Sequence, residues 1–265
     1  MKLGIVISTQ PTKFAALPFQ EGVEENVEKV KKLGFDGVEL AVRNPEELDV
    51  EWMQSILAKN EISVMAIQTG QVFLEEGLCF VHPDPDIRAG AIERIKSHVR
   101  LAGKLGAMVI IGLVRGKDTK DISDENVYGW LSEGLQECAR ENDSVRLIIE
   151  PINRYEVDNI NTVASGVELM EKTGMDNVGL LLDTFHMNIE EPSIVDSIIH
   201  AKEHIFHFHV ADSNRWYPGA GHINFPELLE TLDRVGYKGF ISAECLPLPD
   251  GDTAARKTIE YMRNL

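Results

Sequence analysis

Residues 147–156 read Leu147-Ile148-Ile149-Glu150-Pro151-Ile152-Asn153-Arg154-Tyr155-Glu156, an apolar strand that ends on a carboxylate. A fully apolar strand is typical of a parallel sheet that is covered on both faces. Pro151 interrupts the strand and is followed by polar residues, so Glu150 lies at the strand's carboxyl end. A buried carboxylate is unfavourable unless a positive group meets it. The stretch therefore predicts further polar groups that gather around Glu150.

The same pattern of an apolar strand followed by polar residues recurs along the whole chain. We expect eight strands, at 3–8, 37–42, 62–67, 107–113, 147–150, 178–183, 205–210 and 240–245. We expect helices between and after them, at 22–33, 45–59, 86–105, 123–140, 161–173, 193–201, 225–235 and 253–262, with a long loop from the third strand to Pro85. Such alternation implies a parallel sheet, and eight units in 265 residues are typical of a (β/α)8 barrel.

The fold class predicted is therefore α/β, a TIM barrel that forms a single domain over residues 1–265. No linker, low-complexity tract or block of charge marks a second domain. The rival is an open doubly wound sheet that binds a dinucleotide. That fold calls for a Gly-x-Gly-x-x-Gly motif after the first strand, and the motif does not occur there.

Charge and cysteine content argue against several classes of protein. The chain has 26 Lys and Arg against 43 Asp and Glu, a formal net charge of -17, which opposes binding to nucleic acid. No apolar run is long enough to span a membrane, and the first eight residues predict a strand and not a signal peptide. The three cysteines indicate neither a disulfide framework nor a zinc knuckle. We expect a cytoplasmic protein without nucleic-acid or membrane partners.

Polar residues with metal-binding side chains end the fifth to eighth strands. These are Glu150, Asp183, His209 and Glu244. Because side chains alternate along a strand, each tip shares a face with the residue two positions earlier, and all four tips can point into the barrel. Three carboxylates repel one another when buried, and a divalent cation removes this conflict. The donor set suits one six-coordinate ion per chain, with Mn²⁺ preferred and Mg²⁺ or Co²⁺ as alternatives.

Two of these residues, Glu150 and Glu244, are also candidate catalytic groups. Their strands are three apart around the barrel, which leaves room for a substrate between them. A cation at this place would act as a Lewis acid on oxygens of a bound substrate. One glutamate could then remove a proton from a substrate carbon, and the other could return a proton to the opposite face.

A set of motifs between residues 150 and 244 resembles a known family. They are Glu150-Pro-x-Asn-Arg-Tyr-Glu156, Leu182-Asp183-Thr-Phe-His186-Met-Asn188, His209-x-Ala-Asp-x-Asn-Arg215, Pro218-Gly-x-Gly221 and Glu244. In order and spacing they resemble the D-tagatose and D-psicose 3-epimerase group of the xylose-isomerase-like TIM barrels. The resemblance implies a sugar epimerase that inverts C3 of a ketose, in a homodimer or homotetramer. The cation would then polarise the C2 carbonyl and C3 hydroxyl of the ketose, and removal of the C3 proton would give a cis-enediolate. The resemblance also implies that Glu150, Asp183, His209 and Glu244 bind the metal, and that Glu156, His186 and Arg215 bind the substrate.

Other functions fit the same predicted site. An aldose–ketose isomerase, a hydroxypyruvate-type isomerase or an inosose-type dehydratase would use it on a different carbon. A metal-dependent AP endonuclease would need extra histidines on the third and fourth strands, whose tips are Gln68-Thr69 and Gly112-Leu113. A non-catalytic sugar-binding protein would not need two glutamates. A phosphorylated sugar could meet Arg115, Lys117, Arg154 or Arg215, but no glycine-rich helix start follows the last two strands, which favours a free sugar.

Several neighbouring residues have a structural interpretation. Glu39 on the second strand is expected to pair with Arg43, with support of the metal site as the alternative. His207 is expected to be a hydrogen-bonded residue inside the barrel and not a ligand. Phe14 and Trp216 lie on expected loops near the barrel mouth and could shape the pocket.

Overall fold

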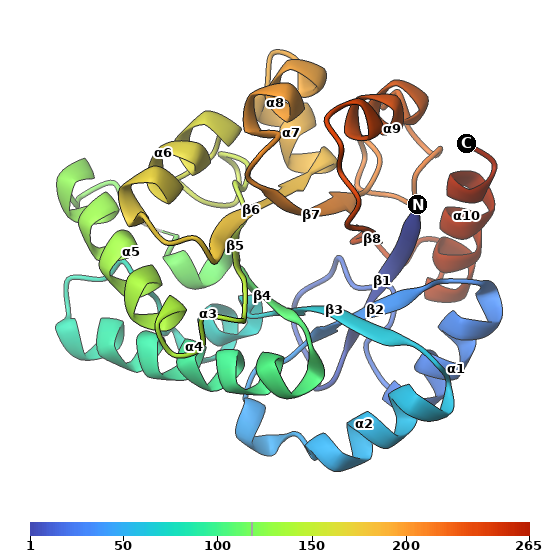
Figure 1. Cartoon of the computed structure of the whole chain (residues 1–265), viewed down its shortest axis with the longest axis horizontal. Coiled ribbons are helices and arrows are strands. Elements are labelled where there is room, and N and C mark those ends of the chain that lie inside the picture. Colours follow the sequence, from blue (N-terminus) through green and yellow to red (C-terminus); the bar gives the residue numbers. More distant parts are fainter. Residues whose placement is uncertain (118) are drawn as a thin grey trace.

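Parallel strands close into one barrel, in which each strand pairs with the next and β8 pairs with β1 (Figure 1). The computed structural model describes residues 1–117 and 119–265 of the chain. The strands are β1 (Lys2–Ser8), β2 (Gly37–Ala41), β3 (Ser63–Gln68), β4 (Met108–Ile111), β5 (Leu147–Ile149), β6 (Val178–Asp183), β7 (Ile205–Val210) and β8 (Phe240–Ala243). The predicted (β/α)8 barrel is confirmed, and the open dinucleotide-binding sheet is excluded.

Helices surround the strands on the outside (Figure 1). They are α1 (Val23–Leu33), α2 (Val50–Lys59), α3 (Gly70–Glu76), α4 (Pro85–Leu105), α5 (Asp124–Ala139), α6 (Val163–Thr173), α7 (Thr184–Glu190), α8 (Ile194–Ala201), α9 (Phe225–Arg234) and α10 (Gly251–Arg263). Two short 3₁₀ helices, η1 (Pro45–Glu47) and η2 (Leu113–Arg115), complete the described elements.

The structure departs from the expected helices at three places. The helix expected at 45–59 is divided into η1 and α2, because Leu48 is extended and the Asp49 side chain starts a new helix by accepting from the Trp52 amide. The expected loop after the third strand contains α3, and α7 begins directly on Asp183. Both of these helices have seven residues. Two turns are too short for an amphipathic period to be read from the sequence.

The alternation of side chains along β5 decides what the barrel encloses. Leu147 and Ile149 pack outward in the main core beneath the helices, whereas Ile148 packs inside the barrel. The interior floor consists of Ala66, Ile110, Ile148 and Leu181. Glu150 follows Ile149 and therefore shares the inward face with Ile148. The floor separates the polar strand tips from the opposite end of the barrel.

No helix in the described part of the chain is both long and apolar enough to cross a membrane. Cys79, Cys138 and Cys245 are buried and free, so no disulfide constrains the barrel.

Truncation of the interior floor is expected to destabilise the protein strongly. Leu181 is fully buried, and Leu181→Ala should lower the free energy of unfolding by about 2–5 kcal/mol because it leaves a cavity among rigid strands. Urea unfolding followed by circular dichroism measures the loss. Leu74→Ala is the matched control, since Leu74 is 37% exposed and should change stability little. Equal losses in the two variants would contradict a packed floor.

Candidate functional site

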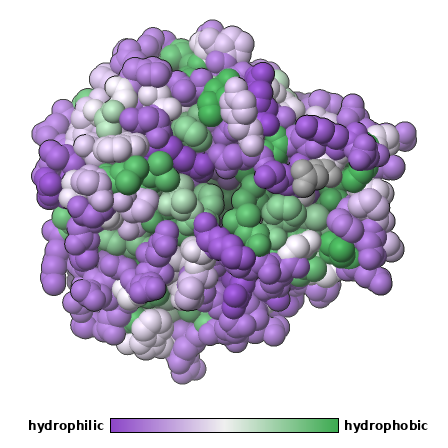
Figure 2. Space-filling model, turned by 180° about the vertical axis from the view of Figure 1, so that it is seen from behind, coloured by the Kyte–Doolittle hydropathy of each residue, from purple (hydrophilic) through white to green (hydrophobic). Residues whose placement is uncertain are grey.

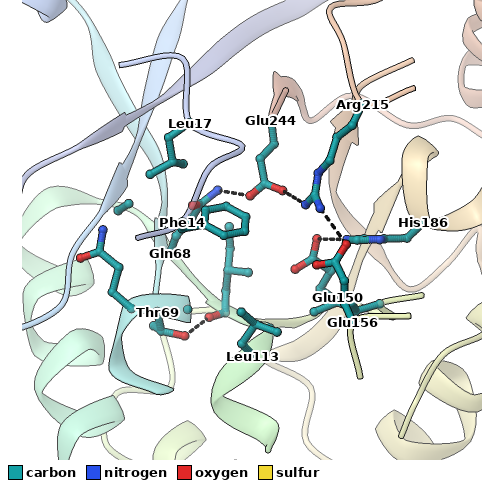
Figure 3. A pocket seen from close by; sticks show the side chains of 16 residues that line it. Phe14, Leu17, Gln68, Thr69, Leu113, Glu150, Glu156, His186, Arg215 and Glu244 are labelled. Atoms are coloured by element: carbon teal, nitrogen blue, oxygen red, sulfur yellow. Dashed lines mark hydrogen bonds and ion pairs between the residues drawn. The ribbon is translucent and has the colours of Figure 1, made fainter. Parts of the chain in front are cut away.

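A cavity opens at the carboxyl ends of the strands, the end at which α3 and α7 leave β3 and β6. Its charged wall contains Glu150, Glu156, His186, Arg215 and Glu244, and Figure 3 shows these side chains grouped together. The remaining wall is mostly apolar and includes Phe14, Leu17, Ala41, Ile110, Leu113 and Ile152. Seen from behind Figure 1, the molecule shows hydrophobic side chains around a central hollow (Figure 2). The cavity thus joins a charged half to an apolar half.

The four predicted metal ligands come together at the base of this cavity. Glu150, Asp183, His209 and Glu244 are buried, and each offers one ligand atom within 4.8 Å of the others. The Nδ1 of His209 lies 3.9 Å from Glu150 Oε1 and 3.8 Å from Asp183 Oδ2. Within the described residues, these three atoms have no hydrogen-bond partner. Buried polar atoms without partners are rare, and three that converge fit a divalent cation as their common partner.

Local structure positions two of the ligands, Asp183 and Glu150, for this cluster. Asp183 ends β6 and caps α7: Oδ1 accepts from the Phe185 amide at 2.7 Å, and Oδ2 faces the cluster. Glu150 lies beside Gly112, where an added Cβ would stand 2.9 Å from Glu150 Oε2. A side chain at position 112 would therefore displace the carboxylate, which gives this glycine a role at the tip of β4.

Glu39 inside the barrel orients His209. Its Oε1 accepts from His207 Nε2 at 2.5 Å and from His209 Nε2 at 2.9 Å. Since Nε2 of His209 is bound to Glu39, Nδ1 is the nitrogen that faces the carboxylate cluster and would present its lone pair to a bound cation. The expected Glu39–Arg43 ion pair is wrong, because β2 turns Glu39 inward while Arg43 pairs with Glu47 outside the barrel at 3.2 Å. The expected hydrogen-bonded role of His207 is confirmed.

Burial and mutual repulsion control the charges of the cluster. Burial, then the charge of Glu244, raises the pKa of Glu150 well above its usual range. Burial also raises the pKa of Asp183 and of Glu244. For His209, burial favours the neutral imidazole, but the charge and the hydrogen bond of Glu39, together with the charges of Glu244 and Glu150, raise the pKa to about 10. The chain without a cation therefore holds protons at this place that a bound cation would displace.

The three predicted substrate contacts all line the cavity. Arg215 donates from Nη1 to Glu156 at 2.7 Å and from Nη2 to Glu244 at 3.2 Å. His186 lies in α7 and not in a loop as expected, with Nε2 3.8 Å from Glu150 Oε1. Asn153 belongs to the Glu150–Glu156 motif, and its amide donates to Glu156 at 3.0 Å and contacts His186 Nδ1 at 2.7 Å. Asn153 thus fixes the orientation of two of the three residues.

Other candidates lie away from the charged wall. Arg154 binds Glu190 at 2.7 Å, whereas its near neighbour Glu156 binds Arg215 at 2.7 Å. Phe14 lines the cavity, as expected, whereas Trp216 is not part of its wall. Gln68 at the tip of β3 was expected to provide no metal ligand, and its amide instead donates to Glu39 at 3.1 Å and Glu244 at 2.8 Å.

Comparisons with known proteins agree with this architecture. Residues 27–265 match the family described as xylose isomerase-like TIM barrel. The chain is 34% identical over 227 residues to the D-psicose 3-epimerase of Agrobacterium fabrum, covering 82% of this chain and 77% of that protein. It is 32% identical over 228 residues to the D-psicose 3-epimerase of Ruminiclostridium cellulolyticum, covering 82% and 76%. The crystal structure of D-psicose 3-epimerase with D-tagatose from Clostridium cellulolyticum H10 has a TM-score of 0.85 at 27% identity, covering 100% of this chain and 99% of that one.

The chain belongs to the xylose isomerase-like TIM barrel family and, within it, to the ketose 3-epimerase group.

The stabilisation of the protein by Mn²⁺ is expected to increase with pH. The raised pKa values of Glu150, Asp183, Glu244 and His209 mean that the folded metal-free chain holds protons that the unfolded chain releases. This contribution to stability is fully present below the unfolded carboxyl pKa of about 4 and is lost as pH rises through the folded values. A cation replaces these protons, so its effect on the melting temperature should be larger at pH 8 than at pH 5.5.

Thermal melts in chelator and in Mn²⁺ at the two pH values measure the effect. Asp183→Asn keeps a side chain that can cap α7 and should reduce the Mn²⁺ shift at pH 8. Asp176→Asn changes an exposed loop residue and should leave the shift intact. An Mn²⁺ shift that is independent of pH would contradict this assignment of charges.

Loss of the Glu39 carboxylate should weaken metal binding. In Glu39→Gln one neutral amide faces two imidazoles, so His209 loses the charged partner that directs its Nδ1 to the cluster. Removal of such supporting groups typically weakens metal affinity by about 10–100-fold. Titration with Mn²⁺ followed by electron paramagnetic resonance measures the dissociation constant. Glu47→Gln, at the exposed pair with Arg43, is the control, and an unchanged constant in Glu39→Gln would refute the role of Glu39.

Proposed function

We propose that this protein is a divalent-metal-dependent sugar epimerase that inverts C3 of a ketose, with Glu150 and Glu244 as its acid–base pair. The observation that carries the proposal is the position of these two carboxylates. They leave strands three apart in the barrel, yet offer atoms within 4.8 Å of one another at the base of one cavity. Two carboxylates on opposite sides of a substrate carbon can remove a proton from one face and deliver one to the other.

The proposed cofactor is one Mn²⁺ per chain, held by Glu150, Asp183, His209 and Glu244, with Mg²⁺ or Co²⁺ as substitutes. The donors are three carboxylates and one imidazole, a set that suits these ions. When bound, the ion supplies Lewis acidity that makes the C3 hydrogen of the ketose easier to remove.

The chain's own residues divide the remaining tasks. One of the two glutamates takes the C3 proton, and the electron pair of the broken C–H bond passes into the enediolate of the sugar. The other glutamate donates its proton to the opposite face of C3, which completes the inversion without any other reactant. Burial raises the pKa of both carboxyls. A bound cation would oppose this rise, so the two effects together set the proton affinity of each glutamate.

Arg215, His186 and Glu156 are the proposed substrate contacts. Burial lowers the pKa of His186 well below its usual value, so the imidazole is neutral. With the Asn153 amide donating to Nδ1, Nε2 carries the hydrogen and can donate to a substrate oxygen. The Arg215 guanidinium lies over the Phe185 ring at 4.8 Å and holds Glu156, which positions both charged groups toward the sugar.

The paired glutamates favour epimerisation over the alternatives. An aldose–ketose isomerase, a hydroxypyruvate-type isomerase or an inosose-type dehydratase would use the same ligands but would move a proton at another carbon. An AP endonuclease would need further ligands at the tips of β3 and β4, where Gln68 is instead hydrogen-bonded to two carboxylates. A non-catalytic sugar-binding protein would not need an acid–base pair. A cytoplasmic location and a homodimer or homotetramer stay predictions from the resemblance.

Removal of either carboxylate should nearly abolish turnover. In Glu150→Gln or Glu244→Gln, the amide cannot exchange protons with C3, so kcat should fall by about 10²–10⁴-fold while some Mn²⁺ binding persists. Incubation with Mn²⁺ and a panel of ketoses in D₂O, followed by NMR, detects epimers and deuterium at C3.

Glu133→Gln on the exposed face of α5 is the control and should retain activity. Full activity in either active-site variant would refute the acid–base assignment. Deuterium at C1 in place of C3 would assign the protein to the isomerases.

A further inference from the structure

The side-chain amide of Gln71 presents a buried hydrogen-bond acceptor in the cavity wall. Gln71 belongs to α3, lines the cavity and is 3% exposed. Its Nε2 contacts Ser8 Oγ at 3.0 Å, and the Ser8 hydroxyl donates to the Gln10 carbonyl at 2.6 Å. A hydroxyl has one proton, so Ser8 Oγ must accept from Gln71, which fixes the direction of the amide. Gln71 Oε1 is then left without a hydrogen-bond donor among the described residues.

Gln71 lies across the barrel from Glu150 and Asp183 of the metal-type cluster, whereas Glu244 extends from β8 beside β1 and accepts from Gln68. Gln71 follows β3 and contacts the last residue of β1, whereas Glu150 and Asp183 extend from β5 and β6. In the closed order β1 to β8, the first and third strands face the fifth and sixth. Figure 3 shows the same division, with Leu17, Gln68 and Thr69 on one side and Glu150, Glu156 and His186 on the other. A sugar held at C2 and C3 by the charged side would extend its remaining carbons toward Gln71.

The amide nitrogen of Gln68 and the hydroxyl of Thr69 on that side are already paired. Gln68 donates to Glu39 and Glu244, and the Thr69 hydroxyl donates to the Ile110 carbonyl at 2.6 Å. The rest of the wall is apolar. A buried acceptor without a donor is unfavourable by about 1–3 kcal/mol, and a substrate hydroxyl can relieve this.

The basic residues Lys13 and Lys117 line an adjoining pocket that shares Phe14 and Leu113 with this cavity, and neither lines the cavity itself. Of the four basic residues singled out from the sequence, Arg215 alone lines the cavity, and it is bound to Glu156 and Glu244. Arg115 is fully buried and donates to the carbonyls of Gly112 and Ile160. A phosphate monoester is largely an acceptor at neutral pH, so its oxygens would face the oxygen of Gln71 without a proton to share.

We propose that Gln71 is a specificity-determining residue that accepts a hydrogen bond from the terminal hydroxyl of a non-phosphorylated ketose. This inference rests on the proposed function and adds the class of substrate to it. The enzyme selects a free sugar whose end remote from the carbonyl carries a hydroxyl. A terminal deoxy sugar leaves the acceptor unpaired, and a terminal phosphate offers it no hydroxyl proton.

The test compares one ketose with its terminal deoxy analogue and its terminal phosphate, in the wild-type protein with Mn²⁺ and in Gln71→Met. Methionine has a similar length and no amide. In the wild type, kcat/KM should fall by about 10-fold from the parent to the deoxy sugar, as expected for one unpaired buried acceptor. In Gln71→Met the two sugars should differ by less than about 2-fold, because the acceptor is gone. The phosphorylated sugar should be the poorest wild-type substrate.

Gln54→Met is the matched control, since Gln54 donates to the Lys104 carbonyl outside the barrel and should keep wild-type selectivity. Equal preference for the hydroxyl in wild type and Gln71→Met would overturn the inference, as would efficient turnover of the phosphate. Calorimetric binding of the same three sugars measures the selectivity without turnover. Selective binding without C3 exchange would refute the epimerase function but support the role of Gln71. C3 exchange without selectivity would support the epimerase function but refute the role of Gln71.

Discussion

Three carboxylates and an imidazole, all buried within 4.8 Å of one another, are the constraint on which the rest of this site depends. Like charges at this distance in a poorly solvated place are strongly unfavourable, and the pKa values of Glu150, Asp183 and Glu244 all shift upward accordingly. A barrel tolerates such a cluster because its strands are held by a separate outer core, so the tips can carry charge without loss of the fold. The interior floor of apolar residues below the tips separates the charged site from the rest of the barrel interior.

A second set of residues keeps the cluster in one arrangement. Glu39 holds two imidazoles, Gln68 joins Glu39 to Glu244, and Arg215 joins Glu244 to Glu156. Each of these hydrogen bonds fixes the orientation of a side chain in the cluster. His209 turns Nδ1 to the carboxylates because Glu39 occupies its other nitrogen. Preorganisation of this kind reduces the reorganisation needed when substrate binds.

The two halves of the cavity serve different parts of a sugar. The charged half faces the carbons at which protons move, where strong electrostatic contacts matter most. The other half is apolar apart from a few amides and hydroxyls, and among the described residues of this half Gln71 has a fully buried acceptor without a partner. A single neutral acceptor on an apolar wall discriminates by the presence of a hydroxyl and not by charge. The proposed contact to the terminal hydroxyl and the proposed proton transfer thus lie on opposite sides of the same barrel.

The sequence by itself determined the barrel and its polar tips. Period-two alternation and apolar strands locate β5 to β8 closely, and the side-chain parity of Ile148 and Glu150 follows from strand geometry alone. The same local rules could not find α3, whose two turns are too short to show a period, or the division of the second helix at Leu48.

Contacts between distant strands were decided only by the tertiary structure. Glu39 and His209 are 170 residues apart, and Gln68 and Glu244 are 176 apart. Nearness in sequence favoured Arg43 as the partner of Glu39, but the barrel turns the two side chains to opposite sides. The unpaired Oε1 of Gln71 in α3 likewise depends on Ser8, the last residue of β1, because Ser8 fixes the direction of the Gln71 amide. Strand periodicity is a local property of the chain, whereas hydrogen-bond partners inside a barrel depend on closure and register, which bring residues from every strand to one axis.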